Sequence, residues 1–396
     1  MSTRFRHPFR PTGQSLPARL AAALLLAWAG CAPMPGLHGS AHAQTARSPQ
    51  TPQAMESRPA WQREAVPFYD TVHALQGIYA HHATPQAQAW ERSAQALTGA
   101  LAALCQASPG TDAQAALQQA RTAWRSTAGA WEALSAVAIG PVITRRTQRA
   151  IDFTPTRPAL IEKAIPTQPQ GAAAMERIGT PAKGLPALEW LLWTRPVQPS
   201  TPACGYAHEV ALDIAREAAA VTAEFARAAQ TDWGAEEQQD ASTQAMSEFV
   251  NQWVGGMERL RWAHMEKPLR AAQGSKAPEY PRSASQSTLA AWAATWQGLR
   301  SVTVQSASAA APAPGTALVP LATYLRGKGQ NLLADKLQQA VQKVDSSMAQ
   351  VQRAGVRGKA AIQQAARDLA ALKFLAESEV APALQVSIGF SDADGD

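Results

Sequence analysis

Apolar residues three and four positions apart recur almost everywhere from Trp61 onward. In the segment 112–140, Leu117, Trp124, Trp131 and Leu134 fall on one stripe of a helix. Alanine is abundant and runs of β-branched residues are scarce. This spacing is typical of amphipathic helices packed on one another, and it leaves no segment that favours a strand. The sequence therefore predicts an all-α fold.

Breaks in the helical pattern indicate the domain organisation. The pair Gly140-Pro141 ends one long helix, and the segment 141–183 contains six prolines and only short helical pieces. A long irregular stretch in a helical protein is usually functional or connects domains. We expect an N-terminal helical bundle with its Pro-rich connection over 61–183, and a C-terminal bundle over 184–396.

The first 43 residues have the features of a signal peptide. They contain four arginines, no acidic residue and an apolar run over 20–32, which is too short to span a membrane. Ala41 and Ala43 suit cleavage after Ala43, and the segment 44–60 is then a flexible linker. Lipidation at Cys31 is an alternative processing route. Both routes predict a periplasmic or cell-envelope protein, with membrane contact only through a lipid anchor on Cys31.

The charge of the chain excludes one class of partner. The chain has 36 Lys and Arg against 30 Asp and Glu, but four of the arginines lie in the signal peptide, which leaves a net charge of +2 after cleavage. No cluster of basic and aromatic residues remains, so we expect no nucleic-acid binding. The two remaining cysteines, Cys105 and Cys204, have no metal-ligand spacing. They form either a disulfide or two buried thiols.

The stretch "GLPALEWLLW" (184–193) places one acid, Glu189, among apolar residues. Gly184 permits an unusual backbone angle, and Pro186 suits a first helical turn. Burying an ionised carboxylate costs several kcal/mol unless it has a partner. Glu189 is therefore either a metal ligand or pocket carboxylate, or one half of a structural salt bridge to an arginine.

Another group of charges lies in the segment 131–158. Glu132 interrupts an apolar helix face, and Arg145, Arg146, Arg149 and Asp152 follow its end. Arginine forks hold carboxylates in fixed geometry. We predict a pocket formed by Gly184, Glu189, Glu132, Arg149 and Asp152, with an arginine of 145–149 next to Glu189. The alternative is that these arginines are solvated and cap helix ends.

Catalytic motifs are missing from the sequence. It contains no HExxH, GxSxG or phosphate-binding loop, so we assign no catalytic residue. The tryptophan pairs 190/193 and 292/296 favour packing, although a haem or protein-partner site would also use them.

The ordered set of these segments resembles the imelysin-like family of bacterial envelope proteins, and most closely its predicted periplasmic lipoproteins. The matching segments, over roughly 61–396, are "GPVITRRTQRAIDFTPTRPALIEKAI", "KGLPALEWLLW", "MERLRWAHMEKPLR" and the terminal "SIGFSDADGD". The resemblance implies two related helical-bundle domains with a pocket at their junction. It also implies an association with iron uptake and, in part of the family, a metallopeptidase activity.

The family signature GxHxxE places Gly184 and Glu189 here, with Pro186 where the histidine would stand. Proline offers no lone pair to a metal, whereas a hydrolytic metal site needs about three protein ligands. We therefore expect a non-enzymatic envelope protein associated with iron acquisition. Its ligand would be a small molecule, iron or another divalent metal near Glu189, and iron-uptake components would be its partners. The alternative is an imelysin-family metallopeptidase.

Overall fold

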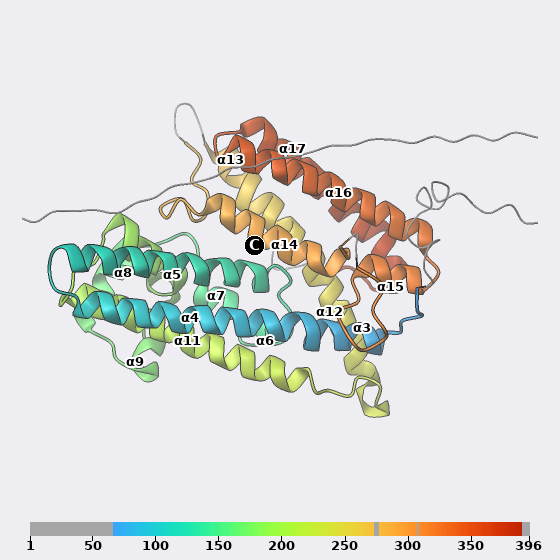
Figure 1. Cartoon of the computed structure of the whole chain (residues 1–396), viewed down its shortest axis with the longest axis horizontal. Coiled ribbons are helices and arrows are strands. Elements are labelled where there is room, and N and C mark those ends of the chain that lie inside the picture. Colours follow the sequence, from blue (N-terminus) through green and yellow to red (C-terminus); the bar gives the residue numbers. More distant parts are fainter. Residues whose placement is uncertain (1–65, 273–276, 307–308, 390–396) are drawn as a thin grey trace, which may run out of the picture. The chain divides into compact units, whose positions relative to one another are not determined.

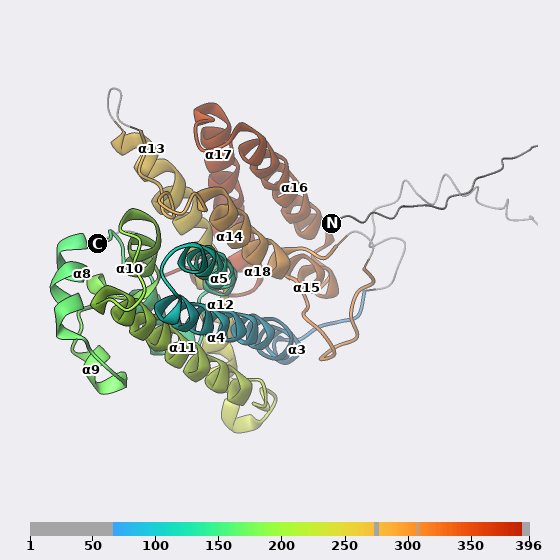
Figure 2. The same ribbon diagram turned by 60° about the vertical axis from the view of Figure 1, so that its left-hand side comes forward.

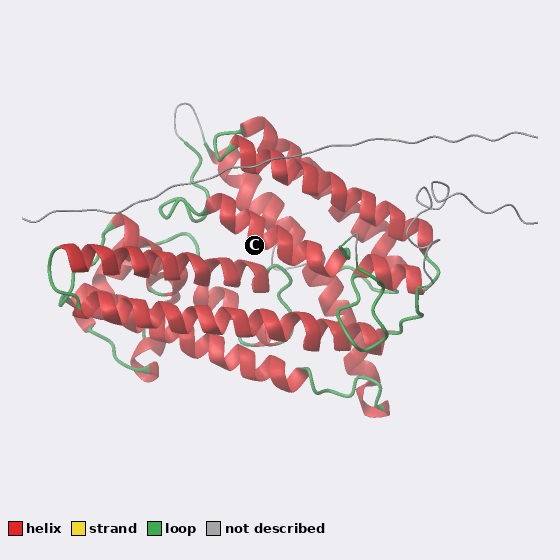
Figure 3. Cartoon of the chain, viewed as in Figure 1, coloured by secondary structure: helices red, strands yellow, loops and turns green. Residues whose placement is uncertain are grey.

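The computed structural model describes residues 66–272, 277–306 and 309–389. Across these ranges the chain forms helices and loops and no strand, which confirms the all-α class (Figure 3). The predicted signal peptide, the linker over 44–60 and Cys31 lie outside the described residues. Within the described ranges, no helix combines the length and the apolar character that crossing a membrane requires.

The described elements comprise α-helices, short 3₁₀ turns and four π-helical segments. In chain order the α-helices are α3 (Thr71–Ile78), α4 (Thr84–Gln106), α5 (Thr111–Ser135), α6 (Pro141–Thr144), α7 (Thr147–Ile151), α8 (Pro158–Ala164), α9 (Ala172–Glu176), α10 (Gly184–Glu189), α11 (Pro202–Ala228), α12 (Gln239–Glu258), α13 (Lys267–Ala271), α14 (Thr288–Thr303), α15 (Leu321–Gly327), α16 (Asn331–Ala354), α17 (Lys359–Leu375) and α18 (Ala381–Ala383). The π-helical segments are Tyr79–Ala83, Trp190–Thr194, Arg259–Glu266 and Ala376–Val380, and the 3₁₀ turns are Ile165–Thr167, Thr180–Ala182 and Glu236–Gln238.

Three long helices form one side of the fold. Helix α4 packs between α5 and α11, and all three lie side by side in Figures 1 and 2. A disulfide between Cys105 and Cys204 joins the end of α4 to the start of α11. Of the two states left open for these cysteines, the structure shows the disulfide.

The short helices of the Pro-rich segment 141–183 pack along α11. Arg145 contacts Glu217 at 2.7 Å and Glu224 at 2.9 Å, and both acids lie on α11. At the other end of the segment, Lys183 contacts Asp213 of the same helix at 2.9 Å. These ion pairs hold α6 to α10 in place beside α5 and α11.

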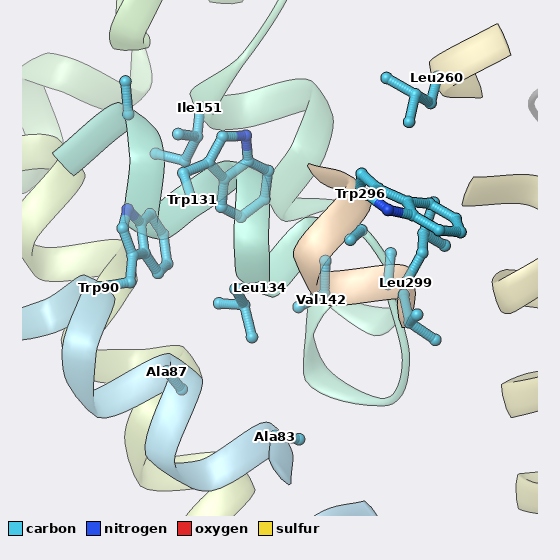
Figure 4. Packing of buried hydrophobic residues seen from close by; sticks show 14 of the residues in the cluster. Ala83, Ala87, Trp90, Trp131, Leu134, Val142, Ile151, Leu260, Trp296 and Leu299 are labelled. Atoms are coloured by element: carbon cyan, nitrogen blue, oxygen red, sulfur yellow. The ribbon is translucent and has the colours of Figure 1, made fainter. Parts of the chain in front are cut away.

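Helix α14 connects the two sides of the fold. It packs against α5 on one side and α16 on the other, and α17 packs against α16, α12 and the π-helical segment Arg259–Glu266. Figure 4 shows the same continuity, because Trp90 lies on one side of Leu134 while Trp296 and Leu299 lie on the other. The described residues belong to one compact unit.

The predicted domain boundary between residues 183 and 184 stays a prediction. Helices α10 and α11 follow that boundary in the sequence, but they pack against α5 and α4, which precede it.

Two glycines bring three helices into close contact at the end of α5. A Cβ atom at Gly256 of α12 would lie 2.0 Å from the carbonyl oxygen of Ala136, and one at Gly298 of α14 would lie 2.6 Å from that of Ala133. The neighbours are backbone atoms, which cannot move aside as a flexible side chain can. Glycine is therefore needed at both positions for α12 and α14 to approach α5.

We predict that Gly256→Ala lowers the free energy of unfolding by about 1 to 3 kcal/mol, the usual cost of forcing an extra group into a packed core. Thermal and urea unfolding of the purified mature protein would measure it. The control is Gly99→Ala in α4, where an added Cβ meets nothing within 4 Å. We expect that variant to be as stable as the parent or up to about 1 kcal/mol more stable, because alanine favours helix. Equal losses in both variants would contradict the close approach.

Candidate functional site

The segment "GLPALE" forms α10, and all six of its residues are buried. Gly184 has a φ of +78°, and a Cβ there would lie 2.3 Å from the carbonyl oxygen of Ile151. Only glycine suits both the backbone angle and this contact. The start of α10 therefore lies directly against the end of α7, whose next residue is Asp152.

Helix α10 is also fixed to α5. The indole N–H of Trp124 donates to the carbonyl oxygen of Leu185 at 3.1 Å. Helix α10 then continues into the π-helical segment Trp190–Thr194. Single π-helical turns within α-helices are frequent at functional sites.

Glu189 is 7% exposed and contacts a loop almost a hundred residues away. Its Oε1 accepts the backbone N–H of Ser285 at 2.8 Å. The carbonyl oxygen of Ser285 in turn accepts from Arg125 of α5 at 3.0 Å. Glu189 thus ties the loop that precedes α14 to α10, and its partner is a backbone donor on a distant segment.

Arg282, on the same loop, is the centre of a buried ion cluster. It is 4% exposed, and its guanidinium donates to Glu132 at 3.0 Å and to Asp152 at 2.6 Å. The backbone of Arg282 has a φ of +62°, an uncommon conformation for a residue with a side chain. The charge of Glu189 also acts on Arg282 and, with those of Asp152 and Glu132, raises the pKa of this guanidinium, although burial opposes the rise.

Neutral donors add one hydrogen bond to each of the two carboxylates. Thr295 of α14 donates to Oε2 of Glu132 at 3.2 Å, and the indole of Trp131 donates to Oδ2 of Asp152 at 3.1 Å. Burial raises the pKa of Glu132, and the charge of Asp152 adds to that rise, while Arg282 opposes it. We use the name "ion cluster" for Glu132, Asp152, Glu189 and Arg282 together.

A second arginine and a histidine from one π-helical segment adjoin the ion cluster. Arg259 donates to the carbonyl oxygen of Ser135 and, at 3.0 Å, to Gln148. His264 lies on the same π-helical segment, and burial, together with the charge of Arg259, lowers its pKa to about 4. Oδ1 of Asp152 and Nδ1 of His264 are buried without a hydrogen-bond partner.

The structure brings together four of the five residues predicted to form the pocket. Glu132 and Asp152 bind Arg282, the charge of Glu189 acts on the same guanidinium, and Gly184 lies against the residue before Asp152. Arg149 is exposed and lies outside the ion cluster.

The expectation that an arginine of 145–149 neutralises Glu189 is wrong. Arg145 is engaged with Glu217 and Glu224, and the cation on which the charge of Glu189 acts is Arg282. Arg282 had no signal in the sequence, because the segment around it, "EYPRSASQST", is polar and lies 93 positions after Glu189.

The ion cluster does not fit a metal ion. Within residues 66–272, 277–306 and 309–389, no three or more His, Cys, Asp or Glu side chains are grouped so that they could hold one. The position between the two carboxylates is filled by the guanidinium of Arg282, and Pro186 offers no ligand atom on α10. We therefore derive no chemistry through a metal at this site.

Comparison with known proteins decides the family. The family model for Imelysin matches residues 83–380, most of the chain. The chain belongs to the imelysin family. Among functionally curated proteins, the comparison finds no match.

Two solved structures share the fold of this imelysin-family protein. An imelysin-like protein from Psychrobacter arcticum is 18% identical, with a TM-score of 0.65 over 81% of this chain and 97% of that one. A putative iron-regulated protein A precursor from Parabacteroides distasonis is 12% identical, with a TM-score of 0.61 over 77% of this chain and 93% of that one. At these identities the likeness shows the fold alone.

We predict that Arg282→Met lowers the free energy of unfolding by about 3 to 5 kcal/mol, because it leaves two buried carboxylates without their counter-charge. Urea unfolding would measure the loss. The matched control is Arg195→Met, whose partner Glu162 and own side chain are both more than half exposed, and which should cost less than about 1 kcal/mol. A loss for Arg282→Met no larger than that of the control would show that the ion cluster is not desolvated.

Two half-buried histidines, His82 and His264, predict a pH dependence of stability. The pKa of His264 and that of His82 are each lowered from 6.5 to about 4 in the folded protein. The unfolded chain therefore binds more protons between these values, and the free energy of unfolding should fall as the pH falls from about 6.5 to about 4. His264→Gln should flatten part of this slope, and exposed His81→Gln should not. An unchanged slope in His264→Gln, measured by urea unfolding at several pH values, would contradict the burial of this ring.

Proposed function

We propose that this imelysin-family protein is a non-enzymatic component of the cell envelope that serves iron acquisition. The observation that carries the proposal is the placement of Arg282. The guanidinium of Arg282 lies between the carboxylates of Glu132 and Asp152, and the charge of Glu189 acts on the same guanidinium. A metallopeptidase would need a metal with an open position in such a site. An arginine in that place has no ligand position to offer and no proton to release at ordinary pH.

Export to the periplasm is part of the same proposal. The signal-peptide features of residues 1–43 support it, and a disulfide between Cys105 and Cys204 suits an oxidising compartment. A structural neighbour described as an iron-regulated protein precursor supports the association with iron. Under this proposal the ion cluster has a structural role and does no chemistry. Partners in iron uptake would contact the surface of the protein.

The absence of catalysis is tested with the mature protein, residues 44–396, with its disulfide intact. We expect no cleavage of a casein or mixed-peptide substrate after incubation with zinc, iron(II) or calcium, because Glu189 has no second metal ligand on α10. Cleavage that EDTA abolishes, and that Glu189→Gln also abolishes, would establish the metallopeptidase instead.

The association with iron is tested in the native host. We expect the abundance of the protein, measured by quantitative proteomics of the envelope fraction, to rise at least severalfold when an iron chelator is added and to return on addition of iron. A zinc-selective chelator at matched growth inhibition is the control. An abundance that does not respond to iron would refute the role in iron acquisition and leave the result on catalysis unaffected.

A further inference from the structure

A cavity of about 740 Å³ lies on the C-terminal side of the fold, apart from the ion cluster. Three stretches of chain line it: the end of α13, the loop that leads into α14, and the turn between α16 and α17. A volume of this size is in the range of pockets that hold a small organic molecule.

One part of the wall is apolar. Leu269 of α13, Leu289 of α14 and Val356 of the α16–α17 turn line the cavity. Val356 is 39% exposed although it is a large apolar residue. Covering such surface with an apolar ligand gains about 25 cal/mol for each Å² removed from water.

The part of the wall formed by the turn between α16 and α17 is positively charged. Arg357 and Lys359 line the cavity, and neither makes an ion pair with any residue in the described ranges. Lys359 is the first residue of α17, a helix of 17 residues whose start has no side-chain cap. Uncapped N–H groups and the helix dipole both favour an anion at this end. Two unpaired cations and a bare helix start thus concentrate positive potential at one rim of the cavity.

Tyr280 gives an independent indication of a ligand. This residue lines the cavity and is 5% exposed, and its hydroxyl is buried without a hydrogen-bond partner. Its ring is fixed edge-on against Trp292 of α14, with ring centroids 5.0 Å apart. A buried hydroxyl that finds no partner costs about 1 to 3 kcal/mol. An acceptor atom of a bound molecule would remove that cost.

We propose that this cavity binds a small organic anion with an apolar body, such as a medium-chain carboxylate. Arg357 and Lys359 receive the carboxylate at the start of α17, the Tyr280 hydroxyl donates to an oxygen of the same carboxylate, and the apolar wall covers the hydrocarbon. This site is separate from the ion cluster, and it does not rest on the proposed role in iron acquisition.

The loop that leads into α14 lies between the cavity and the ion cluster and contributes residues to both. Tyr280 and Ser283 line the cavity, while Arg282 and Ser285 of the same loop contact the carboxylates of the ion cluster. The wall of the cavity is therefore tied to a loop whose other side is fixed by buried ion pairs.

The test uses octanoate as the probe and the mature protein, followed by isothermal titration calorimetry at low salt. We expect binding with a stoichiometry near one, and much weaker binding of octanol, which has the same chain without the charge. Arg357→Gln/Lys359→Gln should weaken octanoate by roughly tenfold or more, because it removes both charge-assisted contacts. Tyr280→Phe should weaken it by a few-fold, since it removes only the hydroxyl.

A control variant separates this site from general attraction to positive charge. Lys343→Gln/Arg353→Gln removes two cations from α16 that do not line the cavity, and it should leave the affinity unchanged. Equal losses in the two double variants would overturn the proposal, as would a lack of octanoate binding at millimolar concentration. An unchanged affinity in Tyr280→Phe, together with a loss in Arg357→Gln/Lys359→Gln, would place the anion on the surface and overturn the cavity as its site.

Discussion

The contact between Arg282 and its two carboxylates joins three segments that are far apart in the sequence. Glu132 lies on α5, Asp152 follows α7, and Arg282 lies on the loop before α14. A buried ion pair adds little net stability compared with an apolar core of the same shape, but the loss of one partner is costly. The cluster therefore restricts the loop to one arrangement more than it adds to the total free energy of folding. The same loop then places the backbone N–H of Ser285 on Glu189.

This arrangement gives the acid of the family signature a structural partner. Where the signature has a histidine, this chain has Pro186, and the cation near Glu189 is a guanidinium from another segment. The guanidinium of Arg282 serves Glu132 and Asp152 at once. It differs from a metal ion in chemistry, because it is held by its hydrogen-bond geometry and gives no open coordination position. The proposed non-enzymatic role follows from this difference in the donor set.

The loop that carries Arg282 has two faces with different properties. The inner face makes buried ion pairs, and the outer face lines a cavity whose charged rim has no partner among the described residues. Such a division is expected where a rigid scaffold supports a binding surface, because a ligand site is more selective when its wall does not move. The tight approach of α12 and α14 to the end of α5, through Gly256 and Gly298, adds to that rigidity.

The spacing of apolar residues determined the all-α class by itself, because a 3.6-residue period is a local property of the chain. It also indicated that Glu189 and Glu132 need partners, since an acid in an apolar run is costly wherever the run folds. The identity of the partner was decided only by tertiary structure. Arg282 and Arg145 are both arginines in polar segments, and nothing local distinguishes the one that pairs with Glu132 from the one that pairs with Glu217. Packing of α14 between α5 and α16 made that choice, because it carries the loop before α14 to the carboxylates.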